Sequence, residues 1–296
     1  MPTAPWVRPT AAVPGPAPAS FTDLVAAGVA PEKIADNLKL AEGPLWLPDG
    51  HVIVSEVNAN AVLAFDATGQ RSTFLQPSGY ANGHTFDAQG RIIQAEHSGR
   101  LTRIEADGQI TLLADKFEAK RLNSPNDVAV KSDGAIYFTD PDFGLGKRTS
   151  EIGFNGVYRF DAATSKLTLL TRDIDKPNGI VFSLDERTLY ISDSTSGRIH
   201  AYSMKADGTL GEGKDFGPGN DGLALDVHGN VWSANGPAVT VIKPDGTVLG
   251  DIAFPEPVTN LAWGSADGNI LFVTTYTQFY KVQTLTTEAM SPGNNP

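Results

Sequence analysis

The sequence predicts an all-β fold, a six-bladed β-propeller with four-stranded blades, and a repeated polar position is the main reason. Six segments begin with a carboxylate or carboxamide side chain and reach a turn eight residues later. The segments start at Glu42, Asn82, Asn126, Asn178, Asp221 and Asn260. Their turns lie at Gly50, Gly90, Gly134, Glu186, Gly229 and Gly268. The starts are 40, 44, 52, 43 and 39 residues apart, and periods near 40 residues are typical of propeller blades.

Each period contains the signals of four short strands. An apolar inner strand follows the polar residue, and a turn such as PDG, AQG, SDG or ADG comes next. The second strand is rich in Val, Ile, Tyr, Phe and Thr, as half-buried strands are; these strands read HVIVSE, RIIQAE, AIYFTD, TLYISD, NVWSAN and NILFVT. A hairpin then completes the blade, as in 61–75, 101–114, 157–170 and 239–252. Asp-Gly and Thr-Gly supply its tight turns, and no helical period competes over a useful length.

The two ends of the chain predict how the ring closes. The last blade offers three strands, at 259–264, 269–275 and 278–284, so the segment 33–40 is expected to add the fourth. This pairing removes two exposed sheet edges. Residues 1–20 are rich in Ala and Pro without the apolar core of a signal peptide, and we interpret them as a flexible leader before a single domain at 21–296. A leader left by signal removal slightly favours a periplasmic or exported protein over a cytoplasmic one.

The amino-acid composition restricts the classes of partner that the protein can bind. With 41% hydrophobic and 19% charged residues, the chain is typical of a soluble globular protein. A formal net charge of −11 argues against nucleic acid, which needs a basic face. No apolar run approaches the ~18–20 residues of a membrane span. The absence of cysteine excludes disulfides, thiolate ligands and thiol nucleophiles. We therefore expect a small-molecule partner and a monomer or small homo-oligomer.

The longest period, between the third and fourth blades, adds most of its excess in residues 140–156 (DPDFGLGKRTSEIGFNG). Long loops in compact domains are often lids or binding loops. A tolerated surface insertion explains the length equally well, but the Gly and Phe content favours a cover near an opening.

The repeated polar residues predict a metal site on the propeller axis. Inner strands line the central channel, so one Glu, one Asp and four Asn converge there. Calcium prefers carboxylate and carbonyl oxygens, whereas zinc is disfavoured without Cys or His at these positions. The alternative is that polar residues before a strand only satisfy backbone groups. Two carboxylates favour the metal, since a turn needs no charge.

Other polar positions are given smaller roles. The second strands end in Glu56, Glu96, Asp140, Asp193 and Asn235. These are expected to accept hydrogen bonds from nearby backbone, with Asp193 kept as a supporting carboxylate. His84 and His97 are candidate substrate contacts or proton carriers at the channel mouth, although packed or exposed histidines are commoner. No G-x-S-x-G elbow, P-loop or dinucleotide fingerprint is present.

At these same residues the chain resembles the gluconolactonase/regucalcin (senescence marker protein) family of six-bladed propellers. The matching segments are AEGPLW (41–46), 82–97, 123–144, 177–194 and NDGLALDVHGNVW (220–232), within about residues 36–285. The resemblance implies one divalent metal ion, Ca²⁺ first and other divalent ions as alternatives. It places the ligands on Glu42, Asn178 and Asp221, with Asn126 as fourth ligand or substrate contact. Asn82 and Asn260 are left as neighbours.

The resemblance also implies a function, a metal-dependent hydrolase that opens lactones. The cation would polarise the lactone carbonyl, and Asp221 would orient or deprotonate the attacking water. Glu42 and Asp221 are the expected catalytic residues. Arg121 is a candidate substrate contact, but its spacing from Asn126 departs from regucalcin. The alternatives are a phosphotriester hydrolase of the same propeller type and a non-catalytic ligand-binding propeller with a structural metal.

Overall fold

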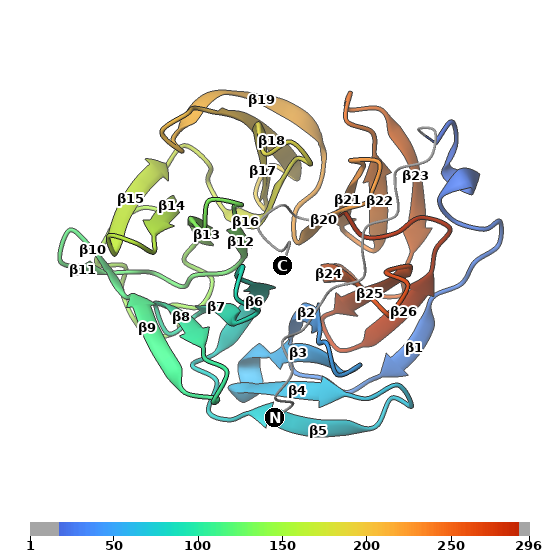
Figure 1. Cartoon of the computed structure of the whole chain (residues 1–296), viewed down its shortest axis with the longest axis horizontal. Coiled ribbons are helices and arrows are strands. Elements are labelled where there is room, and N and C mark those ends of the chain that lie inside the picture. The colour runs from blue at the N-terminus through green and yellow to red at the C-terminus, as the bar shows by residue number, and fades with distance from the viewer. Residues whose placement is uncertain (1–17, 290–296) are drawn as a thin grey trace.

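Six four-stranded antiparallel sheets surround a central channel in the computed structural model, which describes residues 18–289 (Figure 1). The predicted six-bladed propeller is therefore confirmed. Most of the proposed leader lies outside the described residues. Within residues 18–289 no helix has the length and apolar character needed to cross a bilayer. In that described range the helical residues form two short 3₁₀ turns, η1 (Phe21–Asp23) and η2 (Val57–Ala59).

Each blade is built in chain order from the channel outward, except that the outermost strand of blade 6 comes from the start of the described chain. Blade 1 consists of β2 (Ala41–Trp46), β3 (Val52–Glu56), β4 (Ala61–Phe65) and β5 (Arg71–Leu75). Blade 2 consists of β6 (Ala81–Phe86), β7 (Ile92–Glu96), β8 (Arg100–Ile104) and β9 (Ile110–Ala114). Blade 3 consists of β12 (Val128–Val130), β13 (Ile136–Asp140), β14 (Gly156–Asp161) and β15 (Lys166–Thr171). The outermost strands are the most exposed.

The remaining blades repeat this arrangement. Blade 4 consists of β16 (Pro177–Phe182), β17 (Thr188–Asp193), β18 (Arg198–Met204) and β19 (Leu210–Pro218). Blade 5 consists of β20 (Leu223–Leu225), β21 (Val231–Asn235), β22 (Ala238–Ile242) and β23 (Val248–Ala253). Blade 6 consists of β24 (Val258–Gly264), β25 (Ile270–Thr275), β26 (Phe279–Gln283) and β1 (Glu32–Ala35).

The hydrophobic core lies between the blades. Trp232 of blade 5 meets Trp263 of blade 6 edge-on, with ring centroids 5.0 Å apart. Tyr137 of blade 3 meets Phe182 of blade 4 in the same way, at 4.9 Å. Adjacent sheets therefore bury each other's faces, and such aromatic pairs add to the stabilisation from buried apolar area.

The ring closes as predicted, because β1 pairs antiparallel with β26 and places Glu32 opposite Lys281. The strand covers only four residues, fewer than the predicted 33–40. Asn37 and Leu40 both have φ of 59°. This left-handed conformation is incompatible with an extended strand, so β1 ends before them.

The folded body begins before β1. Leu24 and Val25, which follow η1, are buried in the core cluster between blades 5 and 6. Leu285 near the C-terminal end donates its backbone N–H to the carbonyl of Leu24 at 2.8 Å. Both ends of the described chain therefore pack together beside the closing blade.

Deletion of residues 1–20 is expected to leave the melting transition almost unchanged, whereas deletion of 1–40 is expected to abolish folding. The longer deletion removes β1 and the buried pair Leu24 and Val25, and burying each such side chain contributes about 1.5–3 kcal/mol. Solubility and thermal unfolding of the two fragments test this. A soluble 41–296 fragment that melts cooperatively would contradict it.

One element was not expected from the sequence. The two-stranded hairpin β10 (Lys116–Phe117) and β11 (Lys120–Arg121) interrupts the connection between blades 2 and 3. Its two turn residues, Glu118 and Ala119, have positive φ of 49° and 66°. Non-glycine residues in this conformation give no turn signal in a sequence.

Candidate functional site

The six repeated polar residues lie at one end of the six inner strands. Glu42, Asn82 and Asn178 are the second residues of β2, β6 and β16. Asn260 is the third residue of β24, and Asn126 and Asp221 each precede β12 and β20 by two residues. Five of these residues are buried, and Asp221 is half-buried as a whole residue although its Oδ1 atom is buried. We call these six residues the channel ring.

Glycines beside the ring let neighbouring strands approach closely. A Cβ atom on Gly43 would lie 1.9 Å from the backbone oxygen of Asn82 in the next blade. A Cβ on Gly179 would lie 2.4 Å from the backbone oxygen of Asp221. These distances are far below van der Waals contact, so glycine is required. The sheet register also shifts beside ring residues, as at Glu42 and Asn260, and such bulges redirect side chains.

Hydroxyl groups tie the ring backbone from blade to blade. Ser55 donates to the backbone oxygen of Asn82 at 2.9 Å, and Thr139 donates to that of Asn178 at 2.7 Å. Ser192 donates to the backbone oxygen of Asp221 at 2.7 Å. The backbone carbonyls are therefore bonded within the wall.

Four ring side chains carry a buried oxygen without a hydrogen-bond partner. They are the Oδ1 atoms of Asn82, Asn126, Asn178 and Asp221. The carboxamide nitrogen of Asn178 donates to Ser194 Oγ at 3.0 Å, so its oxygen is the free end. Leaving a buried acceptor unsatisfied costs about 1–3 kcal/mol, so a cation or a hydrogen-bond donor such as water would find four acceptors in this ring.

Asn260 differs from these four residues. Its Oδ1 atom accepts the backbone N–H of Leu261 at 2.8 Å, and its side chain also hydrogen-bonds Glu42. It is therefore satisfied within the protein and supports Glu42.

The site concentrates negative charge in a buried place. Burial raises the pKa of Glu42, and the nearby carboxyl of Asp127 raises it further. Burial, Glu42 and Asp127 together raise the pKa of Asp221. Burial raises the pKa of Asp127 to about 7. Without a cation, these three carboxyl groups resist being ionised together.

The residues present fit a hard divalent cation. Calcium takes six to eight oxygen ligands, including carboxylates and carboxamide oxygens, and the ring presents both kinds. Within residues 18–289, no group of three or more His, Cys, Asp or Glu side chains is arranged to hold a metal ion. A metal here would therefore depend on the carboxamides of Asn126 and Asn178 as well as on Glu42 and Asp221.

Asp127 is a site residue that the sequence reasoning missed. It follows Asn126, at a position where the other five blades carry Gly or Leu. Its carboxylate accepts the backbone N–H groups of Val128 at 2.9 Å and Ile180 at 3.3 Å. That break in the glycine pattern was the available signal.

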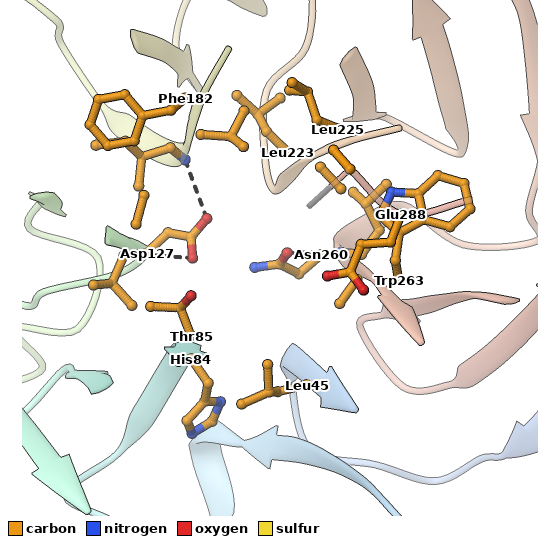
Figure 2. A pocket seen from close by; sticks show the side chains of 18 of the residues that line it. Leu45, His84, Thr85, Asp127, Phe182, Leu223, Leu225, Asn260, Trp263 and Glu288 are labelled. Atoms are coloured by element: carbon orange, nitrogen blue, oxygen red, sulfur yellow. Dashed lines mark hydrogen bonds between the residues drawn. The ribbon is translucent and has the colours of Figure 1, made fainter. Parts of the chain in front are cut away.

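A cavity of about 180 Å³ occupies the channel beyond the ring (Figure 2). It lies along the later halves of the inner strands, and its walls include Leu45, Phe182 and Leu223. Asp127 and Asn260 point into it from opposite sides (Figure 2). Of the ring residues only Asn260 lines this cavity. We assign the chemistry to the ring, because the unpartnered oxygens are there.

The structure places the two histidines differently. His84 bridges the backbone oxygen of Gly43 (2.9 Å) and Gln94 Oε1 (3.2 Å), and it lines the cavity beyond the ring. His97 touches the ring directly through Asn82, with 3.0 Å between His97 Nε2 and Asn82 Nδ2. Burial lowers the pKa of both, and Arg148 adds to the effect at His97, whose pKa is about 4.

Arg121 is engaged elsewhere. Its guanidinium donates to the backbone oxygen of Ser98, and its backbone N–H donates to Glu151. No contact described in residues 18–289 joins its side chain to the ring. Its assignment as a substrate contact stays a prediction.

The carboxylates at the ends of the second strands hold the segments that lead into the inner strands. Glu56 accepts the backbone N–H of Lys39, and Asp140 accepts that of Asn123. Asp193 accepts the backbone N–H of Lys176, two residues before Asn178. These three carboxylates accept backbone hydrogen bonds as expected. Glu96 and Asn235 differ from the expectation: Glu96 accepts from the side chains of Ser98, Arg100 and Thr102, and the Nδ2 atom of Asn235 donates to Thr240 Oγ1.

The fold and the ring together define a six-bladed propeller with an oxygen-lined channel, and the comparisons place it in a family. Residues 40–277 match the family described as SMP-30/Gluconolactonase/LRE-like region. The chain belongs to this family.

Individual relatives agree with that placement. The chain is 31% identical to a gluconolactonase of Zymomonas mobilis over 86% of this chain and 81% of that protein. It is 28% identical to the pentonolactonase XacC of Haloferax volcanii, over 81% and 82% of the two chains. The structure of a gluconolactonase from Xanthomonas campestris superposes with a TM-score of 0.83 at 33% identity, over 96% of this chain and 99% of that one.

Proposed function

We propose that this protein is a hydrolase that opens lactones, dependent on a divalent cation of the calcium type held in the channel ring. The observation that carries the proposal is the set of four buried, unpartnered oxygens on residues of the channel ring. Membership of the gluconolactonase family supports it, as do relatives named gluconolactonase and pentonolactonase.

In this proposal the ring residues have two roles, binding the cation and activating water. Glu42, Asn126, Asn178 and Asp221 hold the cation, which when bound supplies a Lewis acid for a carbonyl oxygen. Asp221 is half-buried whereas Glu42 is only 4% exposed. Asp221 Oδ1 has no hydrogen-bond partner, so Asp221 is the carboxylate left free to bind a water molecule. It orients that water and accepts its proton.

The reaction is an ester hydrolysis within a ring. Water oxygen bonds to the lactone carbonyl carbon, the bond from that carbon to the ring oxygen breaks, and the ring oxygen takes a proton. The product is a hydroxy acid, which releases a proton at neutral pH. A small-molecule lactone or ester is the expected partner.

Proton release from glucono-1,5-lactone and a panel of other lactones tests the proposal, before and after chelation and with bound metal quantified. We expect hydrolysis that chelation removes and Ca²⁺ restores. Full activity in metal-stripped protein would overturn the metal dependence. If the protein hydrolyses a panel of phosphotriesters but none of the lactones, the phosphotriester alternative is favoured. Stoichiometric metal with no hydrolysis at all would favour a non-catalytic propeller with a structural metal.

A further inference from the structure

Asn82 is the ring residue whose orientation depends most visibly on a second side chain. Its Oδ1 atom is buried without a partner, like those of Asn126 and Asn178. Its Nδ2 atom lies 3.0 Å from His97 Nε2. A carboxamide N–H needs an acceptor, so His97 Nε2 carries no proton in this arrangement. While that bond holds, the nitrogen of Asn82 is engaged and its oxygen is the end left without a partner.

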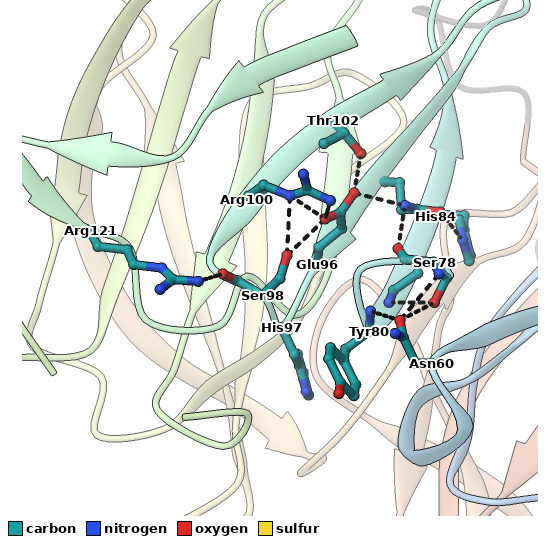
Figure 3. A network of polar contacts seen from close by, with 12 residues as sticks. Asn60, Ser78, Tyr80, His84, Glu96, His97, Ser98, Arg100, Thr102 and Arg121 are labelled. Carbon is teal, nitrogen blue, oxygen red and sulfur yellow. Dashed lines mark hydrogen bonds and ion pairs between the residues drawn. The ribbon is translucent and has the colours of Figure 1, made fainter. Parts of the chain in front are cut away.

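The backbone that carries His97 is held rigidly. His97 follows Glu96, a fully buried carboxylate that accepts hydrogen bonds from Ser98 Oγ (2.8 Å), Arg100 Nε (2.7 Å) and Thr102 Oγ1 (2.7 Å). Figure 3 shows these groups converging on Glu96 while the His97 ring extends away from them. The turn is therefore fixed independently of the His97 ring.

The loop between β13 and β14 covers His97 from the other side. A Cβ on Gly144 would lie 2.4 Å from His97 Cβ and Cγ, so the loop backbone packs directly on this side chain. Gly144 donates its N–H to Ser124 Oγ at 2.8 Å. Arg148 donates to the backbone oxygens of His97 (3.0 Å) and Asn123. The loop is fastened on both sides of the histidine.

We propose that His97, held in place by Gly144 and Arg148, orients Asn82 so that its carboxamide oxygen becomes a further ligand of the cation in the channel ring. This rests on the proposed function, since it assumes that the ring binds a divalent cation. His97 is a positioning residue. Asn82 is added to the four proposed ligands and contributes its carboxamide oxygen. The loop at 141–155 is then a support for the site.

The ligand set gains from this addition. The four residues assigned so far, Glu42, Asn126, Asn178 and Asp221, leave some of the six to eight oxygen positions around a calcium ion to water or to another side chain. Asn82 supplies one more oxygen ligand, and it is the only residue of blade 2 to which we assign that role.

Calcium affinity, measured by isothermal titration of the metal-stripped protein, tests the inference without using activity. His97→Asn and His97→Gln form a matched pair, because a glutamine places an acceptor near the position of Nε2 and an asparagine does not reach it. We expect His97→Asn to weaken calcium binding by about 10–100-fold, the range for lost support of a ligand. His97→Gln should bind close to wild type.

Two further variants separate positioning from general damage. Gly144→Ala adds only a methyl group that collides with the His97 side chain, and it should weaken binding in the same direction. In an Asn82→Ala background, His97→Asn should add nothing, because the two changes remove one interaction. Lys147→Met, at an exposed site beside Arg148, is the control and should bind as wild type. Circular dichroism checks that each variant is folded.

The outcomes are distinguishable. If the wild type binds no calcium, the metal dependence and this inference both fall. If the wild type binds calcium and Asn82→Ala binds equally well, only this inference falls. If His97→Asn weakens binding equally in the Asn82→Ala background, His97 acts by another route and its positioning role is wrong.

Discussion

Replacing Glu42 by glutamine, or Asp221 by asparagine, is expected to reduce kcat/KM for lactone hydrolysis by about 100-fold or more, the scale of a lost metal ligand or its support. Each change keeps the shape of the side chain and removes one negative charge from the ring. Initial rates of proton release at several calcium concentrations measure the effect. Partial recovery at high calcium would assign the loss to affinity.

Asn260→Ala is the internal comparison for these two variants. Its oxygen already accepts the N–H of Leu261, so it is less free to act as a ligand than the unpartnered oxygens of the ring, and the loss of activity should be much smaller. An equally large loss would mean that the choice of Glu42, Asn126, Asn178 and Asp221 is wrong. Glu212→Gln, on the exposed strand β19, should leave the rate unchanged.

Removing the metal is expected to make stability depend on pH in a defined direction. The folded-state pKa of Asp127 is about 7, above its ordinary value of 3.8. The folded protein therefore holds this proton more tightly than the unfolded chain does. Stability falls as pH rises from 3.8 through about 7. Glu42 and Asp221, whose pKa values are also raised, act in the same direction. His84 and His97, whose pKa values are lowered from 6.5, act in the opposite direction below that pH, and we expect the three carboxyl groups to outweigh them.

Thermal unfolding of chelated protein at pH 5 and pH 8 measures this. We expect the lower Tm at pH 8, and a larger increase on adding calcium at pH 8 than at pH 5. Calcium at a hundredfold excess over its Kd stabilises by about 2.7 kcal/mol. Asp221→Asn should raise the metal-free Tm at pH 8, because it removes a repelled charge, and should remove most of the calcium response. A metal-free Tm that rises from pH 5 to pH 8 would contradict this account.

The repeat predicted the blades well because it depends on local features. The polar residue, the apolar strand and the turn recur within a few residues, and the closing strand follows from the missing fourth strand of blade 6. Residues whose role depends on a distant partner were harder to predict. Leu24 and Val25 join the core only because the C-terminal end of the chain lies beside them.

The residues of the candidate site were also hard to predict where their role depends on a distant partner. Position in the repeat brought Glu42 and Asp221 to one ring, but it did not reveal which carboxamide oxygens lack partners. That distinction depends on contacts such as Asn178 with Ser194, or Asn260 with Leu261. Asp127 was missed for the opposite reason. It stands outside the repeated position, and only comparison with the glycines of other blades would have exposed it.

The pairing of β1 with β26 also sets an order of events during synthesis. Ala35 leaves the ribosome first, and its partner Phe279 follows roughly 240 residues later. At about 5–20 residues per second, that delay is on the order of ten seconds to a minute. During this delay, the edge of β1 is unpaired and the apolar residues around Leu24 are unburied. Because neighbouring blades complete the channel ring, the ring is whole only when the last blade has formed.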